Sequence, residues 1–322
     1  MHSLTPDSST HFALQPLVEG VFAALARDGG AAISNAGLLD LGDQVLVFDT
    51  FLTPQAALDL RAASQTLLGR HPTLVVNSHY HNDHIWGHQV FLPKAQILSS
   101  ARTRELIASD GVEEYEWYSA NSAGRLASLR ADYDALPAGP QRDQLNLWIG
   151  YYQGLVDAFP QLQLCMPGVT FSTSLSFHGP KRTAELITFE GAHTGSDTVL
   201  FLPAERILFM SDLLFVNCHP YLGDGDPLRL LETLRELSKL DASMLVPGHG
   251  PVGSHADLQA MIEYIDGCFE TARLLVEQGD VSEARIATLQ VEPKYDNWQL
   301  SRFYPANIEF LCELLAPTDQ AD

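Results

Sequence analysis

Long apolar runs are missing from this 322-residue chain. None approaches the roughly 18–20 residues that a bilayer-spanning helix needs, so we expect no membrane-embedded segment. Positive charge is also scarce, because 19 Lys and Arg residues face 40 Asp and Glu residues and the formal net charge is −21. A chain of this charge repels phosphate groups, which argues against a nucleic acid or an anionic membrane as its main partner.

Features typical of secreted proteins are also scarce. The first basic residue is Arg27, so the N-terminal stretch lacks the positive charge of a secretory signal. The four cysteines are scattered and include no CxxC pair: Cys165, Cys218, Cys268 and Cys312. Such spacing is typical of free thiols in a reducing compartment, so the sequence predicts a cytoplasmic protein.

The order of strand and helix signals indicates the fold class. Hydrophobic residues make up 46% of the chain, which suits a globular protein. Two β-rich stretches, 31–41 and 44–49, flank a Gly42-Asp43 turn and predict a hairpin. Three helix starts carry a capping residue: Thr53 before Pro54, Asp226 before Pro227, and Ser254 with Asp257. We expect one α/β domain over residues 1–322, with mixed sheets.

Residues 101–163 have a different pattern. Apolar and aromatic residues recur there at helical spacing, and Pro137-Ala138-Gly139-Pro140 interrupts them. This pattern predicts an insertion of two or three helices, and a second helical segment is expected at about 280–322. The aromatic residues of the insertion are interpreted first as packing between its helices. A substrate pocket and a homodimer surface remain open alternatives.

The segment His79-Tyr80-His81-Asn82-Asp83-His84 directly follows an apolar strand predicted at 74–78. In an extended chain His79 and His81 point to the same side, so both imidazoles can bind one ion. Asp83 and His84 fall where the chain turns and can reach a second position nearby. Imidazole and carboxylate groups suit zinc, and they also suit iron, manganese or cobalt.

Three further residues of the metal-binding type follow other predicted strands. His193 comes after strand 185–189, Asp212 after 207–210, and His249 after 244–246. A single histidine after a strand is more often a hydrogen-bonded loop residue than a ligand. Four strand ends that all carry such residues, however, predict one metal centre at the edge of a sheet.

Together these motifs resemble the metallo-β-lactamase superfamily of metal-dependent hydrolases, over about residues 15–265 apart from the insertion. The resemblance implies an αββα sandwich with a two-metal site at one edge, and Asp49 is similar to the structural aspartate of the family. One zinc ion would be held by His79, His81 and His193. The other would be held by Asp83, His84 and His249, with Asp212 as the bridge between both ions.

Departures from the family pattern indicate which branch of the superfamily the chain resembles. The β-lactamases of this superfamily usually have Cys or Ser where Asp212 stands, so the chain looks like the hydrolase branches that include glyoxalase II, lactonases and ribonuclease Z. Ser196-Asp197 replaces the Gly-His that follows the third motif in glyoxalase II. The stretch from Asp212 to Pro227 is similar to quinoprotein-relay-type hydrolases. This resemblance implies a mechanism but names no substrate.

The expected function is hydrolysis of a small ester, lactone, thioester or amide. Two metal ions would hold a hydroxide, which Asp83 would orient toward the carbonyl carbon. His219 and Tyr221, seven and nine residues after Asp212, are candidate donors to the developing oxyanion. Zinc is the expected metal, and these ligands also accept iron or manganese.

Two rival functions stay open at this point. A persulfide dioxygenase-like oxidoreductase would use the same fold with a single iron. A non-catalytic metal-binding module would have a closed site without a position for water. A phosphodiesterase or nuclease is disfavoured by the net charge of −21.

Overall fold

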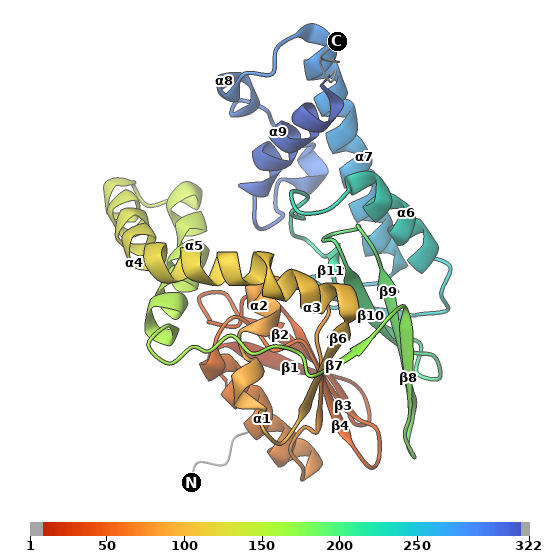
Figure 1. Cartoon of the computed structure of the whole chain (residues 1–322). Helices are drawn as coiled ribbons and strands as arrows, with labels where there is room; N and C mark the ends of the chain where they lie inside the picture. Colours follow the sequence, from red (N-terminus) through yellow and green to blue (C-terminus); the bar gives the residue numbers. More distant parts are fainter. Residues whose placement is uncertain (1–8, 317–322) are drawn as a thin grey trace.

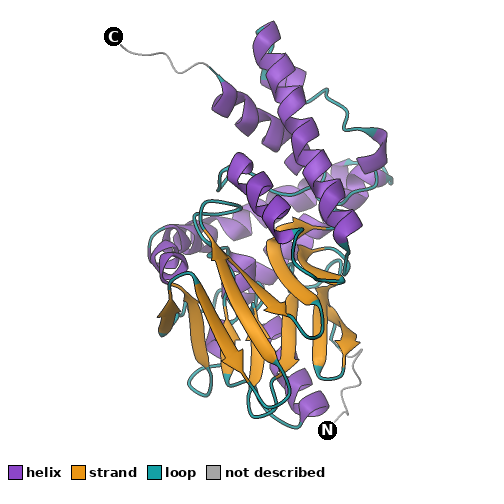
Figure 2. Ribbon diagram, turned by 90° about the vertical axis from the view of Figure 1, so that its right-hand side faces the viewer, coloured by secondary structure: helices purple, strands orange, loops and turns teal. Residues whose placement is uncertain are grey.

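The computed structural model describes residues 9–316, without the side chains at positions 140, 141 and 143. The N-terminal eight and C-terminal six residues of the expected domain, including the end of its 280–322 segment, lie outside the described residues. Within the described part, the strands form two sheets. Figure 2 shows the strands grouped at one end of the molecule and most helices at the other.

The first sheet has seven strands in sequence order: β1 (Phe12–Val18), β2 (Val21–Ala26), β3 (Ala36–Asp40), β4 (Val45–Phe48), β5 (Leu74–Val76), β6 (Gln96–Ser100) and β7 (Val169–Phe171). Strands β1 to β4 pair antiparallel, whereas β4 to β7 pair parallel. The hairpin predicted around Gly42 is present as β3–β4, although its first strand begins at Ala36. The prediction of mixed sheets is therefore confirmed.

The second sheet has five strands in the order β12 (Met244–His249), β11 (Ile207–Phe215), β10 (Asp197–Leu202), β9 (Thr183–Phe189) and β8 (Ser174–His178). Its pairs are antiparallel except for the parallel pair β11–β12. The two sheets pack face to face, and buried side chains such as Leu39, Leu46, Leu200 and Phe209 fill the space between them. Burial of this apolar area is the main stabilising contribution to the sandwich.

Helices cover the outer faces of both sheets. Helix α1 (Pro54–Leu68) packs Ala57 and Leu60 against the first sheet, and α6 (Pro227–Leu237) and α7 (His255–Gln278) pack against the second. Figure 1 shows α1 and α6 on opposite sides of the paired sheets. The layers are therefore α, β, β and α, as predicted. The three predicted capping residues Thr53, Asp226 and Ser254 all accept hydrogen bonds from the first turn of their helices.

The segment predicted as a helical insertion folds into α3 (Ala101–Ala108), α4 (Asp110–Ala135) and α5 (Pro140–Ala158). After α7 come two short helices, α8 (Glu283–Ile286) and η2 (Pro293–Tyr295), and then α9 (Phe303–Leu315). Two further short helices, α2 (Asn82–Ile85) and η1 (His88–Val90), follow β5. Among the described helices, none combines the length and apolar character needed to cross a membrane.

Candidate metal centre

The seven candidate ligands meet at one edge of the sandwich. They come from the segments that follow β5 and β9 and from strands β11 and β12. His79, His81, Asp83 and His84 lie in the turn after β5 and the start of α2, and His193 follows β9. His249 is the last residue of β12. Asp212 differs from the prediction, because β11 does not end at residue 210 but continues to Phe215. A register shift against β12 at Ser211, which has a φ of 48°, turns this part of the strand toward the site.

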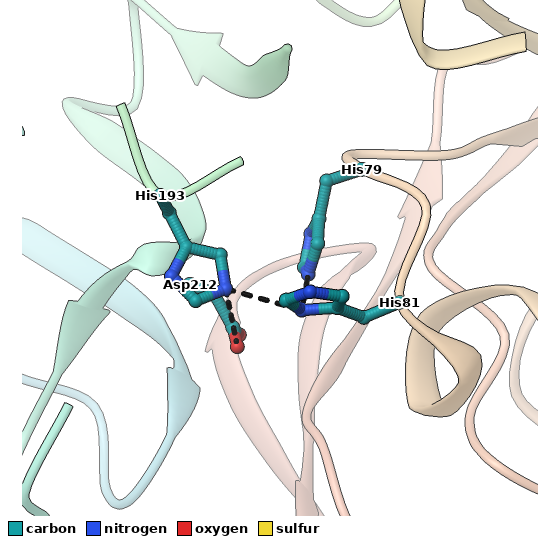
Figure 3. Close-up of side chains that lie close together, drawn as sticks. All are labelled: His79, His81, His193 and Asp212. Atoms are coloured by element: carbon teal, nitrogen blue, oxygen red, sulfur yellow. Dashed lines mark hydrogen bonds and ion pairs between the residues drawn. The ribbon is translucent and has the colours of Figure 1, made fainter. Parts of the chain in front are cut away.

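Four of these side chains form the first group (Figure 3). Nδ1 of His81 lies 3.1 Å from Nε2 of His79 and 3.2 Å from Nε2 of His193. Nε2 of His193 lies 3.5 Å from Oδ2 of Asp212. Tetrahedral zinc with Zn–N distances of about 2.0–2.1 Å keeps its ligand atoms roughly 3.3–3.4 Å apart. The two distances from His81 are therefore close to the spacing that one such ion requires, and all ligand atoms of the group lie within 4.8 Å of one another.

Asp83, His84 and His249 form the second group. Nε2 of His249 lies 3.5 Å from Oδ2 of Asp83, and Nε2 of His84 lies 3.7 Å from Oδ1 of Asp83. Asp212 contacts this group too, at 3.2 Å from Nε2 of His84 and 3.4 Å from Nε2 of His249. Because Asp212 reaches members of both groups, it occupies the position of a bridging carboxylate.

Three atoms of the candidate ligands lack the hydrogen-bond partners that buried polar atoms normally have: Nε2 of His84, Nδ1 of His193 and Oδ1 of Asp212. Nε2 of His84 and Oδ1 of Asp212 face each other at 3.2 Å, and neither makes a hydrogen bond within the described residues. Burial opposes the negative charge of Asp212, but the imidazoles of His249 and His84 hold the pKa of Asp212 well below its usual value. Buried acceptor atoms that converge without donors fit a bound cation. The residues present therefore fit a two-metal centre.

Asp49 forms hydrogen bonds with one candidate ligand and with two serines beside the candidate metal centre. Its Oδ2 atom accepts hydrogen bonds from Nδ1 of His84 at 2.8 Å, from Oγ of Ser78 at 2.8 Å and from Oγ of Ser211 at 2.9 Å. The bond to Nδ1 fixes the tautomer of His84 and leaves its Nε2 lone pair facing Asp212. Asp49 has a φ of 63°, a conformation that costs energy for a non-glycine residue and is often found at functional sites.

The loop that carries His249 is shaped around Asp212. A Cβ atom at Gly248 would overlap Oδ1 of Asp212, so the close approach of this loop requires glycine. Asn35 holds the same loop, because its Nδ2 atom donates to the carbonyl oxygens of Pro247 and Gly250, both at 2.9 Å. These contacts fix the position of His249 relative to the bridge.

Asp224 is a residue of the site that the sequence did not indicate. Its Oδ2 atom lies 2.9 Å from Nε2 of His81, although the two residues are 143 positions apart. Gly225 was the one available signal, since a Cβ there would overlap the carbonyl oxygen of Ala192 and the loop must pass close to His193. Glycine is common in loops, so Gly225 alone could not identify Asp224 as a residue of the site.

A cavity of about 670 Å³ opens above the candidate centre. Asp83, Asp212 and Tyr221 are among the residues that line it. His219, the other predicted donor, is absent from the described lining. Its ring is buried and packs against Tyr264, with Nδ1 2.9 Å from the Tyr264 hydroxyl. The structure thus brings Tyr221 to the cavity but leaves His219 in the core.

The fold and the geometry agree with the comparisons with known proteins. Residues 29–249 match the family model described as metallo-beta-lactamase superfamily, and the chain belongs to this family. A metallo-beta-lactamase from Pontibacter korlensis aligns with a TM-score of 0.59 and 17% identity, covering 80% of this chain and 99% of that one. The metallo-beta-lactamase FIM-1 from Pseudomonas aeruginosa, in a mono-zinc form, aligns with a TM-score of 0.58 and 14% identity, covering 82% and 98%.

A curated relative has a different activity in its name. The chain is 27% identical over 253 residues to the alpha subunit of 2,4-dinitroanisole O-demethylase from Nocardioides sp. (strain JS1661). The alignment covers 78% of this chain but only 59% of that relative. The predicted family and the predicted αββα fold are confirmed. Family and fold do not by themselves define the reaction, which depends on the residues of the site.

Proposed function

We propose that the protein is a metal-dependent hydrolase that acts on a small carbonyl-type substrate: an ester, lactone, thioester or amide. The observation that carries this proposal is the meeting of seven imidazole and carboxylate side chains in two adjoining groups, with Asp212 in contact with both. Members of both groups line a cavity of about 670 Å³, a size that suits a small-molecule substrate.

In this proposal His79, His81 and His193 hold one zinc ion, and Asp83, His84 and His249 hold the other. Asp212 bridges the two positions. When bound, two zinc ions supply Lewis acidity and lower the pKa of water from 15.7 toward about 7, which makes hydroxide available at neutral pH. Iron and manganese accept the same ligands and remain alternatives for the native metal.

The chain positions the reactants around this centre. The side chain of Asp83 is 12% exposed and faces the cavity, so its carboxylate can orient the attacking hydroxide and take up its proton. The hydroxide oxygen bonds to the carbonyl carbon, and the bond from that carbon to the leaving oxygen, sulfur or nitrogen breaks. The proton passes to the leaving group. Tyr221 lines the cavity, and its hydroxyl can donate a hydrogen bond to the oxyanion in this proposal.

Hydrolysis of an aryl methyl ether is the second candidate reaction. It is favoured by the relationship to the alpha subunit of 2,4-dinitroanisole O-demethylase. Addition of water across the ether C–O bond gives a phenol and methanol, so the overall reaction consumes only water. The same hydroxide and the same carboxylates would serve either reaction, and the electrophilic carbon of the substrate would decide between them.

Metal analysis joined to a substrate panel tests the proposal. The zinc-loaded protein is assayed with 4-nitrophenyl acetate, dihydrocoumarin, an acyl thioester, nitrocefin, bis(4-nitrophenyl) phosphate and 2,4-dinitroanisole, before and after chelation and zinc re-addition. We expect about two zinc ions per chain and chelator-sensitive cleavage of a carbonyl substrate. Cleavage of 2,4-dinitroanisole alone would favour the ether reaction.

The same experiment separates the remaining rivals. A single iron per chain with oxygen consumption in the presence of a persulfide would establish the dioxygenase and overturn the hydrolase. Two bound metals without turnover of any substrate would instead indicate the non-catalytic module. Both measurements use the same purified chain, so a difference between protein preparations does not affect the result.

Location and partners form part of the proposal. All four cysteines are free thiols in the structure, which agrees with a reducing compartment such as the cytoplasm. The substrate is the only partner that the site itself implies. The helical insertion remains the surface on which we propose a homodimer.

A further inference from the structure

Two segments outside the strands form the upper walls of the cavity. One is the helical insertion, which contributes Tyr118 of α4 and both Trp148 and Tyr151 of α5. The other is the start of α9, which contributes Phe303. The rings of Trp148 and Phe303 are 6.0 Å apart, so these two segments are in contact with each other.

These walls are mainly aromatic. The ring of Tyr151 lies 5.8 Å from Tyr118 and 5.9 Å from Trp148, and the ring of Tyr221 lies 5.3 Å from Phe303. The Tyr151 hydroxyl is fixed by a hydrogen bond of 2.8 Å from Nδ2 of Asn82, next to the metal-binding motif. Flat rings in edge-to-face contact offer the best complement to another flat ring. The cavity therefore favours an aryl substrate over an aliphatic one.

Arg302 adds a positive charge to this aromatic wall. Its guanidinium carbon lies 2.9 Å from the centre of the Trp148 ring and 5.5 Å from that of Phe303. Where a guanidinium stacks on an aromatic ring, the ring covers one face of it and leaves the N–H donors in its plane for other partners. Within the described residues Arg302 makes no hydrogen bond and no ion pair, whereas Arg182, for example, pairs with Glu205 at 3.0 Å.

The charged residues that line the cavity favour one orientation of a bound substrate. Asp28, Asp83, Glu114, Asp212 and Asp224 are the acidic residues of the lining, and the chain as a whole carries a net charge of −21. Two arginines face them, Arg27 and Arg302, and Nε of Arg27 already donates to the carbonyl oxygen of Phe12 at 3.1 Å. An anionic group is repelled by most of this protein, and Arg302 offers it a cation with unused donors. A substrate with one negatively polarised end would therefore bind with that end toward Arg302 and its other end toward Asp83 and Asp212.

We propose that the substrate is an aryl compound with a carboxylate or nitro group on its ring, and that Arg302 binds this group while Trp148 and Phe303 contact the ring. This inference rests on the proposed function, because it names the substrate class of the same site. Both groups present two oxygens in one plane, the arrangement that a guanidinium binds with two parallel hydrogen bonds. The relative that acts on 2,4-dinitroanisole agrees with a nitroaryl ligand.

Binding of unreactive probes tests this inference without any turnover. Isothermal titration calorimetry on the zinc-loaded chain compares three aryl probes that differ at one position: 4-(hydroxymethyl)benzoate, 4-nitrobenzyl alcohol and 4-(hydroxymethyl)benzamide. A fourth probe, 4-(hydroxymethyl)cyclohexanecarboxylate, keeps the charge but removes the aromatic ring. We expect the benzoate or the nitro compound to bind about tenfold or more tighter than both the benzamide and the cyclohexane probe.

Variants of Arg302 separate its contribution from that of the metal ions, which also attract carboxylates. Arg302→Met should abolish the preference for the charged or nitro probe over the benzamide, and Arg302→Lys should keep only part of it. Arg302→Gln is a second neutral variant, and thermal unfolding checks that each variant folds. Arg273→Met, which removes an exposed arginine of α7 that pairs with Glu270, is the matched control and should bind like the parent.

Each outcome decides one proposal. Equal affinity for the three aryl probes, or an unchanged preference in Arg302→Met and Arg302→Gln, would overturn the inference. Tight binding that depends on Arg302, without cleavage of any ester, lactone, thioester or amide, would instead count against the carbonyl hydrolase and leave the recognition site standing. Cleavage of aryl and alkyl esters at equal rates in parent and Arg302→Met would keep the hydrolase and reject the role of Arg302.

Discussion

Oδ2 of Asp224 lies 2.9 Å from Nε2 of His81, while Nδ1 of the same imidazole faces the nitrogens of His79 and His193. A carboxylate in this position holds the ring by its outer N–H and raises the basicity of the inner nitrogen. Asp224 thus orients His81. In the first group, His81 is the one candidate ligand whose side chain is partly exposed, at 13%.

Replacing Asp224 by Asn or Ala should weaken zinc binding at the first position. Loss of a carboxylate that supports a ligating histidine typically costs about 10–100-fold in metal affinity. Competition with a zinc-sensitive chelating dye measures this change. Asp266→Asn on α7, where the carboxylate is exposed and pairs with Arg235, is the control. Equal zinc affinity of Asp224→Ala and the parent would show that Asp224 does not support His81.

Gly248→Ala should disrupt the bridge without removing any ligand. The new Cβ would overlap Oδ1 of Asp212, so either the carboxylate or the loop of His249 must move. We expect the loss of about one metal ion per chain and a fall in turnover by about two orders of magnitude or more, since small misplacements cost that much. Gly124→Ala in α4, where a Cβ meets nothing within 4 Å, is the matched control.

The control makes the result of Gly248→Ala interpretable. An alanine at position 124 should leave activity unchanged and stabilise the fold slightly, by about 0.5–1 kcal/mol, because glycine is unfavourable within a helix. Full metal content in Gly248→Ala, with turnover like that of Gly124→Ala, would contradict the proposed packing of residue 248 against the bridge.

Asp49→Ala should lower the stability of the fold as well as zinc binding. The substitution removes the acceptor for Ser78, Ser211 and His84 and leaves the buried N–H of Ser78 without its partner, although the two serine hydroxyls still contact each other at 2.8 Å. Each unsatisfied donor costs about 1–3 kcal/mol, so urea denaturation should show a large loss in the free energy of unfolding. Asp241→Ala, which removes an exposed partner of Arg206, should change it little. Similar losses in both variants would refute the supporting role of Asp49.

Tyr221 and His219 should respond differently to substitution. Tyr221→Phe removes the hydroxyl of a cavity-lining residue and should lower kcat by about 100–1000-fold with unchanged metal content, if it donates to the oxyanion. His219→Gln should act on stability instead, because the ring packs in the core and bonds to the Tyr264 hydroxyl. A large fall in kcat of folded His219→Gln, with Tyr221→Phe unaffected, would reverse these assignments.

Local motifs explain why much of the site could be predicted from the sequence. Strand ends are visible as changes from apolar to polar residues, and the parallel strands of a sandwich bring such ends to one edge. The same reasoning misplaced the end of β11, because the polar pair Ser211-Asp212 looks like a strand end although Leu213–Phe215 continue the strand. The tertiary pairing with β12 overrides the local signal there.

Contacts between distant segments could not be predicted. Asp224 and Arg302 both act on residues far away in the chain, His81 and Trp148, and neither lies in a recognisable motif. His219 shows the reverse error, since its closeness to Asp212 in the sequence suggested a donor to substrate. The chain turns after Asn217, which has a φ of 56°, and buries the ring of His219 among aromatic residues.

The most direct test is the zinc content of the parent and of Asp212→Ala, measured by mass spectrometry after dialysis against limiting zinc. Asp212 contacts both groups, at 3.5 Å from His193 and 3.2 Å from His84. We predict about two zinc ions per chain in the parent, and about one in Asp212→Ala with turnover lower by orders of magnitude. Two tightly held zinc ions and full activity in Asp212→Ala would contradict the bridged two-metal centre.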